Sequence, residues 1–406
     1  MRLSHALTLV TDRADSADFK IGLDGIESGT GRLRSNATAE FDGDGIRFRK
    51  GDLLFGKLRP YLAKTWLADR GGAAVGDFLV LRPKPVAVSK FIKYLLLSDS
   101  FLDPIAAAAT GAKMPRADWT TVKAHRVPLP PLDEQRAIAD YLDQETAQID
   151  ALVAKQEEFI GLLRERRSGV IFQAVTRGLR AGIDLKPSPL SWVAEVPASW
   201  RVLNIRRVAE MKTGHTPSRT TPEYWEHTTI PWFTLADVWQ LRDGTRTYLG
   251  ETKSLISPLG LRKSAAELLP AGTVVLSRTA SVGFSGIMPR PMATSQDFWN
   301  WVCGPGLIPE YLLHVFRAMR SEFNLLMIGS THKTIYQPTA AAIRIPVPPV
   351  EEQREIVSYL GDQLPHLDTL ITKAEEHIAL AKERRSALIT AAVTGQFDVR
   401  TARKAG

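Results

Sequence analysis

The sequence contains an internal repeat, and this repeat constrains the fold more than any other feature. When the 406-residue chain is shifted against itself by 218 positions, residues 127–176 match residues 345–394 without a gap and are identical at 24 of 50 positions. The identical positions include Pro130-Pro131, Glu134-Gln135-Arg136 and Glu165-Arg166-Arg167-Ser168. A repeat of this length indicates one structural unit that occurs twice.

Both copies of the repeat predict helices. Prolines precede each copy, and the acidic pairs Asp133-Glu134 and Glu351-Glu352 suit the positive N-terminal end of a helix. Apolar residues then recur at alternating steps of three and four over about four heptads, which is typical of a helix that packs on another helix. The predicted helix-pairing residues are Ile149, Leu152, Phe159, Leu163 and Val170 in the first copy and Leu367, Leu370, Ala374, Ala381 and Leu388 in the second.

Polar residues, among them Arg166 and Arg384, interrupt this predicted seam. Charged residues at a helix seam specify register better than they bind phosphate. We therefore interpret the clusters Glu165-Arg166-Arg167 and Glu383-Arg384-Arg385 as helical salt bridges and partner-docking sites rather than as DNA contacts. Two helices that each lie on their own domain are the alternative to mutual pairing, but two copies of one seam in one chain favour pairing.

The second copy carries helix-breaking residues near its start. Gly361 and Pro365 stand where the first copy has Asp143 and Ala147. We expect a short helix, a kink near these residues, and then a long rod. A rod over residues 146–176 would span about 46 Å at 1.5 Å per residue, which is longer than a small domain is wide.

Two segments outside the repeat predict mixed α/β domains. They are rich in glycine, proline and short β-branched or aromatic runs. The sequence predicts strands at residues 53–55, 78–82, 273–277 and 298–302, helices at 89–98 and 309–323, and a linker at 186–189. The predicted organisation is a first domain at residues 1–127, a helical region at 128–180, a second domain at 181–345 and a second helical region at 346–400.

The two domains also share short pieces of sequence. Gly51 to Lys57 resembles Gly272 to Arg278, and Asp77-Phe78 resembles Asp297-Phe298, whereas the rest has diverged. This pattern suggests one scaffold that carries two different recognition surfaces.

Composition narrows the class of protein. Lys and Arg number 52 against 44 acidic residues, which gives a net charge of +8 and favours a polyanionic partner. The single cysteine, Cys303, excludes a disulfide framework, suits a reducing cytoplasm, and reads more readily as a buried small residue than as a nucleophile. No apolar run reaches the length of a signal peptide or of a membrane span, so we expect a cytoplasmic protein without a membrane partner.

The motifs in combination resemble the specificity subunits of type I restriction-modification systems, over nearly the whole chain. The motifs that carry the resemblance are residues 130–135 and 348–353 at the helix entries, 51–61 in the first domain, and 213–218, 223–225, 277–278, 295–298 and 331–334 in the second. The resemblance implies two target recognition domains separated by two long helices that pack as an antiparallel coiled coil with pseudo-two-fold symmetry. Each domain would read one half of a bipartite double-stranded DNA site.

The resemblance also implies partners for host defence by DNA methylation and cleavage. These are two adenine methyltransferase subunits that use S-adenosylmethionine, joined by up to two endonuclease/translocase subunits that use ATP and Mg. The chain itself would bind no cofactor. One departure from the family is that the first domain begins at Met1-Arg2-Leu3 without a counterpart of Pro197 to Arg201, so we expect either a trimmed first domain or a natural start further upstream.

Basic, polar and aromatic residues in predicted loops are the candidates for DNA contacts. Arg and Lys bind phosphate or guanine and Gln pairs with adenine, but residue type alone separates neither role from that of a solvated surface residue. Lys57, Arg59, Arg278 and Lys333 are favoured because the family resemblance includes them. The candidates are Lys57, Arg59, Tyr61, Lys64, Lys113, Arg116 and Trp119 in the first domain and Thr216, Arg219, Tyr224, Arg278, Thr279, Gln296, His332, Lys333 and Tyr336 in the second.

No catalytic or metal-binding residues are predicted. The chain has no Asn-Pro-Pro-Tyr motif and no glycine-rich loop that ends in Gly-Lys-Ser or Gly-Lys-Thr. Residues 42–45 resemble a calcium loop too briefly and favour a turn, and Asp243, Glu251 and Lys253 have the residue types of a nuclease site by common coincidence. An enzyme with an unrecognised motif and an orphan DNA-binding or repressor protein are the alternatives to a non-catalytic specificity subunit.

Overall fold

The computed structural model describes residues 1–14, 17–40, 45–327 and 333–402. It divides into two compact units, one of Met1–Glu158 with Ala374–Gly406 and one of Phe159–Lys373. Each unit holds one mixed α/β domain and a part of each long helix, α5 (Leu132–Arg177) and α10 (Val350–Thr394), so the predicted fold class is confirmed. Within the described residues, no helix is long and apolar enough to cross a membrane.

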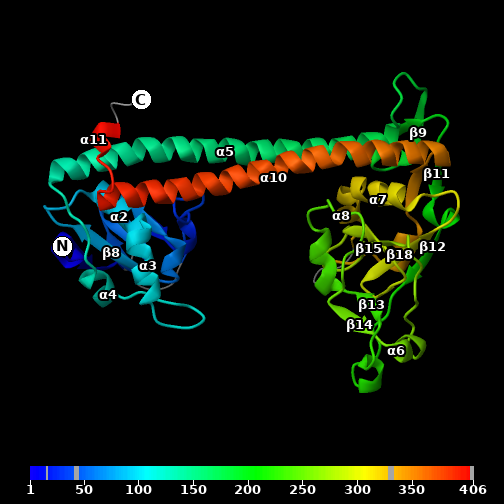
Figure 1. Cartoon of the computed structure of the whole chain (residues 1–406), viewed down its shortest axis with the longest axis horizontal. Helices are drawn as coiled ribbons and strands as arrows, with labels where there is room; N and C mark the ends of the chain where they lie inside the picture. The colour runs from blue at the N-terminus through cyan, green and yellow to red at the C-terminus, as the bar shows by residue number, and fades with distance from the viewer. Residues whose placement is uncertain (15–16, 41–44, 328–332, 403–406) are drawn as a thin grey trace. The chain divides into compact units, whose positions relative to one another are not determined.

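The first unit contains two four-stranded sheets (Figure 1). Its strands are β1 (Leu7–Val10), β2 (Arg13–Ala14), β3 (Lys20–Ile21), β4 (Gly45–Phe48), β5 (Leu53–Gly56), β6 (Thr65–Leu67), β7 (Gly72–Ala74) and β8 (Phe78–Pro83). One sheet is antiparallel with the order β1-β8-β5-β6, and the other has the order β2-β4-β7-β3. Leu53 and Phe55 of β5 pack into one core and Leu54 into another, so this central strand is buried on both faces.

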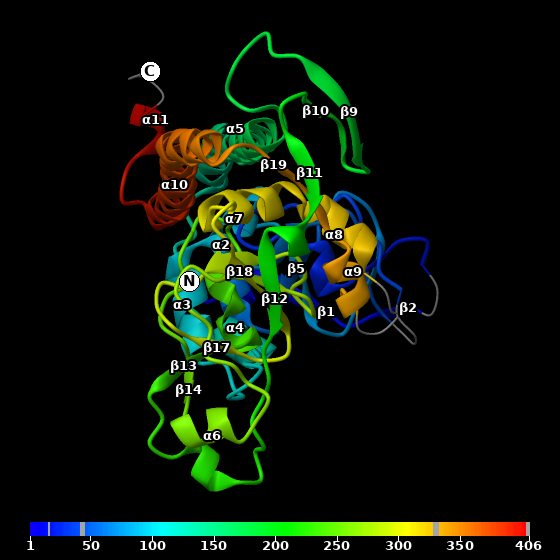
Figure 2. The same ribbon diagram turned by 90° about the vertical axis from the view of Figure 1, so that its right-hand side faces the viewer.

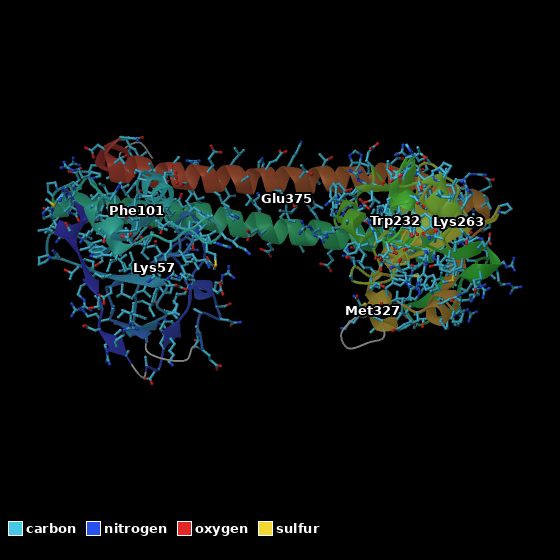
Figure 3. All side chains as sticks on the ribbon, turned by 90° about the horizontal axis from the view of Figure 1, so that it is seen from below. Lys57, Phe101, Trp232, Lys263, Met327 and Glu375 are labelled. Atoms are coloured by element: carbon cyan, nitrogen blue, oxygen red, sulfur yellow. The ribbon has the colours of Figure 1, made fainter. Side chains whose placement is uncertain are left out.

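Most helices of the first unit pack on one face of the antiparallel sheet, whereas Leu23 of η1 packs on the opposite face. They are α1 (Leu3–Ala6), η1 (Leu23–Gly25), η2 (Pro60–Leu62), α2 (Ser89–Leu97), α3 (Asp99–Ala107), α4 (Trp119–Ala124) and α11 (Val399–Ala402). One core joins Phe101 of α3, labelled in Figure 3, to Leu95 of α2, Leu142 of α5 and Ile389 of α10. The ends of both long helices are therefore part of the domain core.

The second unit repeats this plan and adds to it. Its strands are β9 (Leu185–Leu190), β10 (Val193–Pro197), β11 (Arg201–Asn204), β12 (Ala209–Thr213), β13 (Ile230–Phe233), β14 (Ser254–Ile256), β15 (Val274–Ser277), β16 (Ser285–Ile287), β17 (Ala293–Thr294), β18 (Phe298–Cys303) and β19 (Arg344–Val347). Its shorter helices are η3 (Ile205–Arg207), η4 (Pro222–Trp225), η5 (Leu235–Leu241), α6 (Pro258–Arg262), α7 (Pro309–Ala318), α8 (Arg320–Leu326) and α9 (Gln337–Ala341).

The antiparallel sheet β12-β18-β15-β16 corresponds strand by strand to β1-β8-β5-β6. Val274 and Leu276 of β15 face the core that includes the long helices, and Val275 faces the opposite core. A second sheet, β14-β13-β17, lies with α6 at the end of this unit that is away from the long helices α5 and α10 (Figure 2). The predicted strands at 53–55, 78–82, 273–277 and 298–302 and the helix at 89–98 are confirmed within one or two residues.

Three local predictions are wrong. The predicted linker at 186–189 is strand β9, which pairs with β10; its prolines are tolerated because a two-stranded ribbon leaves edge positions without a hydrogen-bond partner. The predicted helix at 309–323 is interrupted at Met319, between α7 and α8. The helix α10 continues through Gly361 and Pro365, because solvent can hydrate the Gly361 carbonyl that loses its donor four residues on.

Candidate nucleic-acid interface

The same backbone frame occurs at the end of the central strand in both units. In the first, the Lys57 N–H donates to Asp77 O at 3.0 Å and the Ala117 N–H donates to Lys57 O at 2.8 Å. In the second, the Arg278 N–H donates to Asp297 O at 2.9 Å and the Ile335 N–H donates to Arg278 O at 3.0 Å. Each unit thereby brings three loops together at one edge of its antiparallel sheet.

Most first-domain candidates lie on these loops. Lys57 is partly buried and Arg59 is exposed, while Tyr61 is 57% exposed on η2. Arg116 approaches from the third loop and pairs with Asp77 at 2.7 Å. Lys57 is labelled in Figure 3.

Three further first-domain candidates differ in their surroundings. Lys113 is exposed on the same third loop as Arg116. Lys64 donates to Leu23 O at 2.7 Å and its side chain is only 12% exposed, so it ties two loops together. Trp119 is partly buried against the core at the start of α4.

The second-domain candidates form two groups. At the strand end, Thr279 and Thr334 share a hydroxyl hydrogen bond of 3.1 Å, and the Thr216 hydroxyl donates to Gln296 Oε1 at 2.6 Å. Lys333 and Tyr336 are exposed beside them. His332 lies outside the described residues.

The other group is built on an arginine and aromatic rings. The Arg219 guanidinium lies 4.0 Å from the centroid of the Trp225 ring and 5.5 Å from that of Trp232, the latter labelled in Figure 3. Tyr224 is the neighbour of Trp225 on η4. This stack belongs to the part of the domain with β13, β14 and α6.

Partial burial lowers the pKa of the cationic side chain at the end of each central strand. Burial, followed by the positive charge of Arg116, lowers the pKa of Lys57, and Asp77 opposes this. Burial also lowers the pKa of Arg278, whose guanidinium lies 4.4 Å from the centroid of the Trp299 ring and whose Nε has no hydrogen-bond partner among the residues that the structure describes. A cation that has already lost part of its hydration gives up less water when it meets a phosphate or a base.

The glutamine at each helix entry holds its own domain through main-chain groups alone. Gln135 accepts the Val88 N–H at 2.8 Å and donates to Val86 O and Pro130 O at 3.0 and 2.8 Å. Gln353 makes the same three bonds, with the Ile308 N–H at 2.9 Å, Gly306 O at 3.0 Å and Pro348 O at 2.9 Å. Both side chains are buried, so the identity of the repeat at this position has a structural cause.

Two repeat-related ion pairs join the long helices within the units. In the first unit Arg385 Nε meets Asp150 Oδ1 at 2.9 Å, and in the second Arg167 Nε meets Asp368 Oδ1 at 2.7 Å. Each arginine also donates to a domain loop, Arg385 to Gly29 O at 2.7 Å and Arg167 to Gly244 O at 2.8 Å. When two helices pack antiparallel, residue numbers rise along one helix as they fall along the other, so the numbers of paired residues have a constant sum. The two ion pairs have the same sum, as antiparallel packing of α5 and α10 requires.

These pairs correct the predicted seam. Arg385 and Arg167 occupy the position that the sequence interpretation gave to Arg384 and Arg166, and those two side chains are exposed. A shift of one residue turns a side chain by about 100° around the helix. The predicted seam position of each arginine is therefore wrong by one residue.

The predicted apolar seam agrees with burial only in part. Leu152, Phe159 and Leu370 are 50%, 43% and 44% exposed, so they do not form the buried seam. Of the other predicted positions, Ile149, Leu163, Leu367 and Ala374 are buried and Val170, Ala381 and Leu388 are partly buried. Sequence reasoning missed the buried residues Ile160, Ile171 and Ile389. Ile171 and Ile389 are buried because the domains cover one side of the helices as well as the seam.

The residues with the chemistry of an active site make local contacts. Asp243 accepts the Thr245 N–H at 2.9 Å and Glu251 pairs with Arg290 at 3.8 Å. Burial raises the pKa of the Cys303 thiol to about 12, which keeps it protonated. Among the residues that the structure describes, no three His, Cys, Asp or Glu side chains converge as metal ligands, and residues 42–44 of the calcium-like loop lie outside that part.

Comparison with known proteins gives one family. The model described as type I restriction modification DNA specificity domain matches residues 37–159 and 197–379, together more than half of the chain. The type I restriction enzyme MjaIX specificity subunit of Methanocaldococcus jannaschii is 30% identical over 171 residues, which cover 42% of this chain and only 39% of that protein. The MjaVIII specificity subunit of the same organism is 24% identical over 75% of this chain and 69% of that protein.

Solved structures agree in fold. A chain from a study of complex assembly and conformational transition of the type I R-M system has a TM-score of 0.77 at 20% identity, with 98% of this chain and 97% of that chain covered. The HsdS subunit from Thermoanaerobacter tengcongensis has a TM-score of 0.52 at 20% identity, with 98% and 96% covered.

Proposed function

The chain belongs to the type I restriction-modification DNA specificity family, and we propose on this basis that it selects the DNA sequence for a methyltransferase complex. Each α/β domain reads one half of a bipartite double-stranded site. The observation that carries the proposal is that one backbone frame occurs at both strand ends with different exposed side chains, Arg59 in one and Lys333 and Tyr336 in the other. Matched frames give two binding surfaces, and differing side chains give two sequences.

The chemistry belongs to partner subunits in this proposal. Adenine methyltransferase subunits supply S-adenosylmethionine, and endonuclease/translocase subunits supply the ATP- and Mg-dependent steps. The chain itself acts by binding and positioning, without an active site or a cofactor. Family membership supports this division of labour.

We further propose that exposed leucines on the long helices dock two methyltransferase subunits. Leu152 and Leu380 are 50% and 61% exposed in the first unit, and their repeat partners Leu370 and Leu162 are 44% and 58% exposed in the second. Each unit thus offers one equivalent leucine from each helix, which fits two copies of one partner.

The long helices also set the spacing between the half-sites in this proposal. Residues at the start and the end of α5 and α10 are built into the domain cores, so a change in helix length displaces a domain rather than a loop.

Co-expression with the cognate methyltransferase subunit, followed by genome-wide mapping of methylated adenines, tests the proposal. We expect one interrupted, asymmetric sequence, and native mass spectrometry should give two methyltransferase subunits per chain. Leu152→Glu with Leu380→Glu should release one of them, whereas Leu325→Glu, at a 79% exposed leucine of α8, should release none. Tight sequence-specific DNA binding without any methylated motif would instead indicate an orphan repressor.

A further inference from the structure

The two strand-end sites have equivalent positions that can be compared one by one. The hydrogen-bond frames align Lys57 with Arg278, and the bridges Leu58 to Arg116 and Thr279 to Thr334 continue the alignment. The next position is Arg59 in the first domain and Ala280 in the second. Both have left-handed backbone, with φ of 50° and 59°.

The first of these positions carries a cation in both domains. Lys57 and Arg278 are each partly buried, and burial lowers the pKa of each. A contact that both domains make alike cannot distinguish two different half-sites. Such a shared contact suits the phosphate backbone, which every DNA sequence presents.

The third position, Arg59 in the first domain and Ala280 in the second, differs in its side chain but has the same backbone conformation. Left-handed backbone is strained in a residue with a Cβ, and strain of this kind gathers at functional sites. The Arg59 N–H donates to Pro115 O at 2.7 Å and Arg59 O accepts the Leu62 N–H at 2.9 Å, so the direction of its side chain is fixed at the root.

Arg59 is also free to bind a ligand, in contrast to its counterpart. Its side chain is exposed and has no hydrogen bond or ion pair with any described residue. Ala280 is exposed and has no side-chain donor or acceptor. An arginine fork matches the O6 and N7 acceptors of guanine in the major groove.

We infer that Arg59 reads a guanine in one half-site and that Ala280 reads no base in the other. We also infer that Lys57 and Arg278 bind phosphates. This inference rests on the proposed function and assigns separate roles within its binding surface. It predicts that affinity and sequence choice are carried by different residues of the same loop.

The test is methylation mapping of the full chain co-expressed with its methyltransferase. Arg59→Ala should relax one guanine position of one half-site, with discrimination there reduced about 5- to 150-fold, and should leave the other half-site unchanged. Ala63→Gly is the matched control, because Ala63 has the same left-handed backbone (φ 49°) in the same loop; it should leave the motif intact. An unaltered motif in active Arg59→Ala would overturn the inference, whereas a wild-type complex without a bipartite motif would overturn the proposed function instead.

Salt titration of DNA binding tests the phosphate contacts. Lys57→Ala and Arg278→Ala should each weaken binding to all sequences alike and make the slope of log K against log salt shallower by about 0.9. Lys50→Ala, at an exposed lysine before the other end of β5, should leave the slope unchanged. A change of the methylated motif in Lys57→Ala would overturn its assignment as a phosphate contact.

Discussion

Removing Arg385 should destabilise the first unit by about 3–5 kcal/mol, the usual loss when one partner of a buried ion pair is deleted. Its guanidinium is 8% exposed and donates to Asp150, to Gly29 O and to Thr30 O. Arg385→Ala leaves two loop carbonyls without these donors, and Asp150 keeps its ion pair with the half-exposed Arg32 at 2.9 Å.

The equivalent ion pair of the second unit, Arg167 with Asp368, should contribute less to the free energy of unfolding. Asp368 is 24% exposed and Arg167 donates to one loop carbonyl instead of two, so Arg167→Ala should cost about 2–3 kcal/mol. The neighbouring arginines are the matched controls. Arg384→Ala and Arg166→Ala remove exposed side chains with the same charge and should change the free energy of unfolding by no more than about 0.5 kcal/mol.

Urea unfolding followed by far-UV circular dichroism gives the total change for each variant. Hydrogen exchange, read by mass spectrometry on peptides of α5 and α10, then assigns the loss to one unit or the other. A double-mutant cycle of Arg385→Ala with Asp150→Ala should give a coupling energy of about 1–3 kcal/mol. If Arg384→Ala were as destabilising as Arg385→Ala, or if the cycle gave no coupling, the ion pair would not be the source of the stability.

Three further predictions concern the helix entry, a buried histidine and helix length. Gln353→Leu should destabilise the second unit by about 2–4 kcal/mol in urea unfolding, because the Ile308 N–H and two carbonyls lose their partner. Burial lowers the pKa of His314 from 6.5 to about 3, so the stability it contributes is complete above pH 6.5 and is lost as the pH falls. Wild type should therefore lose about 3 kcal/mol more than His314→Leu between pH 7 and pH 4, and equal losses would count against this. Four residues inserted after Glu158 of α5 together with four after Lys373 of α10, at the boundary between the two units in each helix, should add about 6 Å of helix and lengthen the DNA spacer by one or two base pairs; an unchanged spacer in an active mutant would contradict the spacing role.

The sequence predicts the duplicated plan because identity over the repeat and short β-branched or aromatic runs in the strands are local signals. It predicts the strand-end loops for the same reason, since Gly51 to Lys57 and Gly272 to Arg278 keep one pattern around a buried strand. It fails at Arg167 and Arg385, because neighbouring arginines differ only in which side of the helix they face. A signal was nevertheless present, since Asp150, Arg167 and their partners are all identical between the copies.

The seam residues show the second limit of sequence reasoning. A heptad pattern assumes that one side of a helix is covered, whereas here a domain covers a further side and buries Ile171 and Ile389. Leu152 and Leu370 then fall outside both contacts although their spacing fits. The pairing of Pro187 with Glu195 in a hairpin likewise depends on a partner strand that local composition does not reveal.

The glutamine at each helix entry has a consequence for how such chains change over generations. Within the part of the chain that the structure describes, Gln135 and Gln353 bond to N–H and C=O groups and to no side chain. The domain residues that these glutamines contact can therefore change without loss of these hydrogen bonds, provided that the main chain keeps its course. A domain exchanged by recombination would therefore meet the glutamine without any change, and only the apolar contacts of the long helices with the domain core would have to be kept.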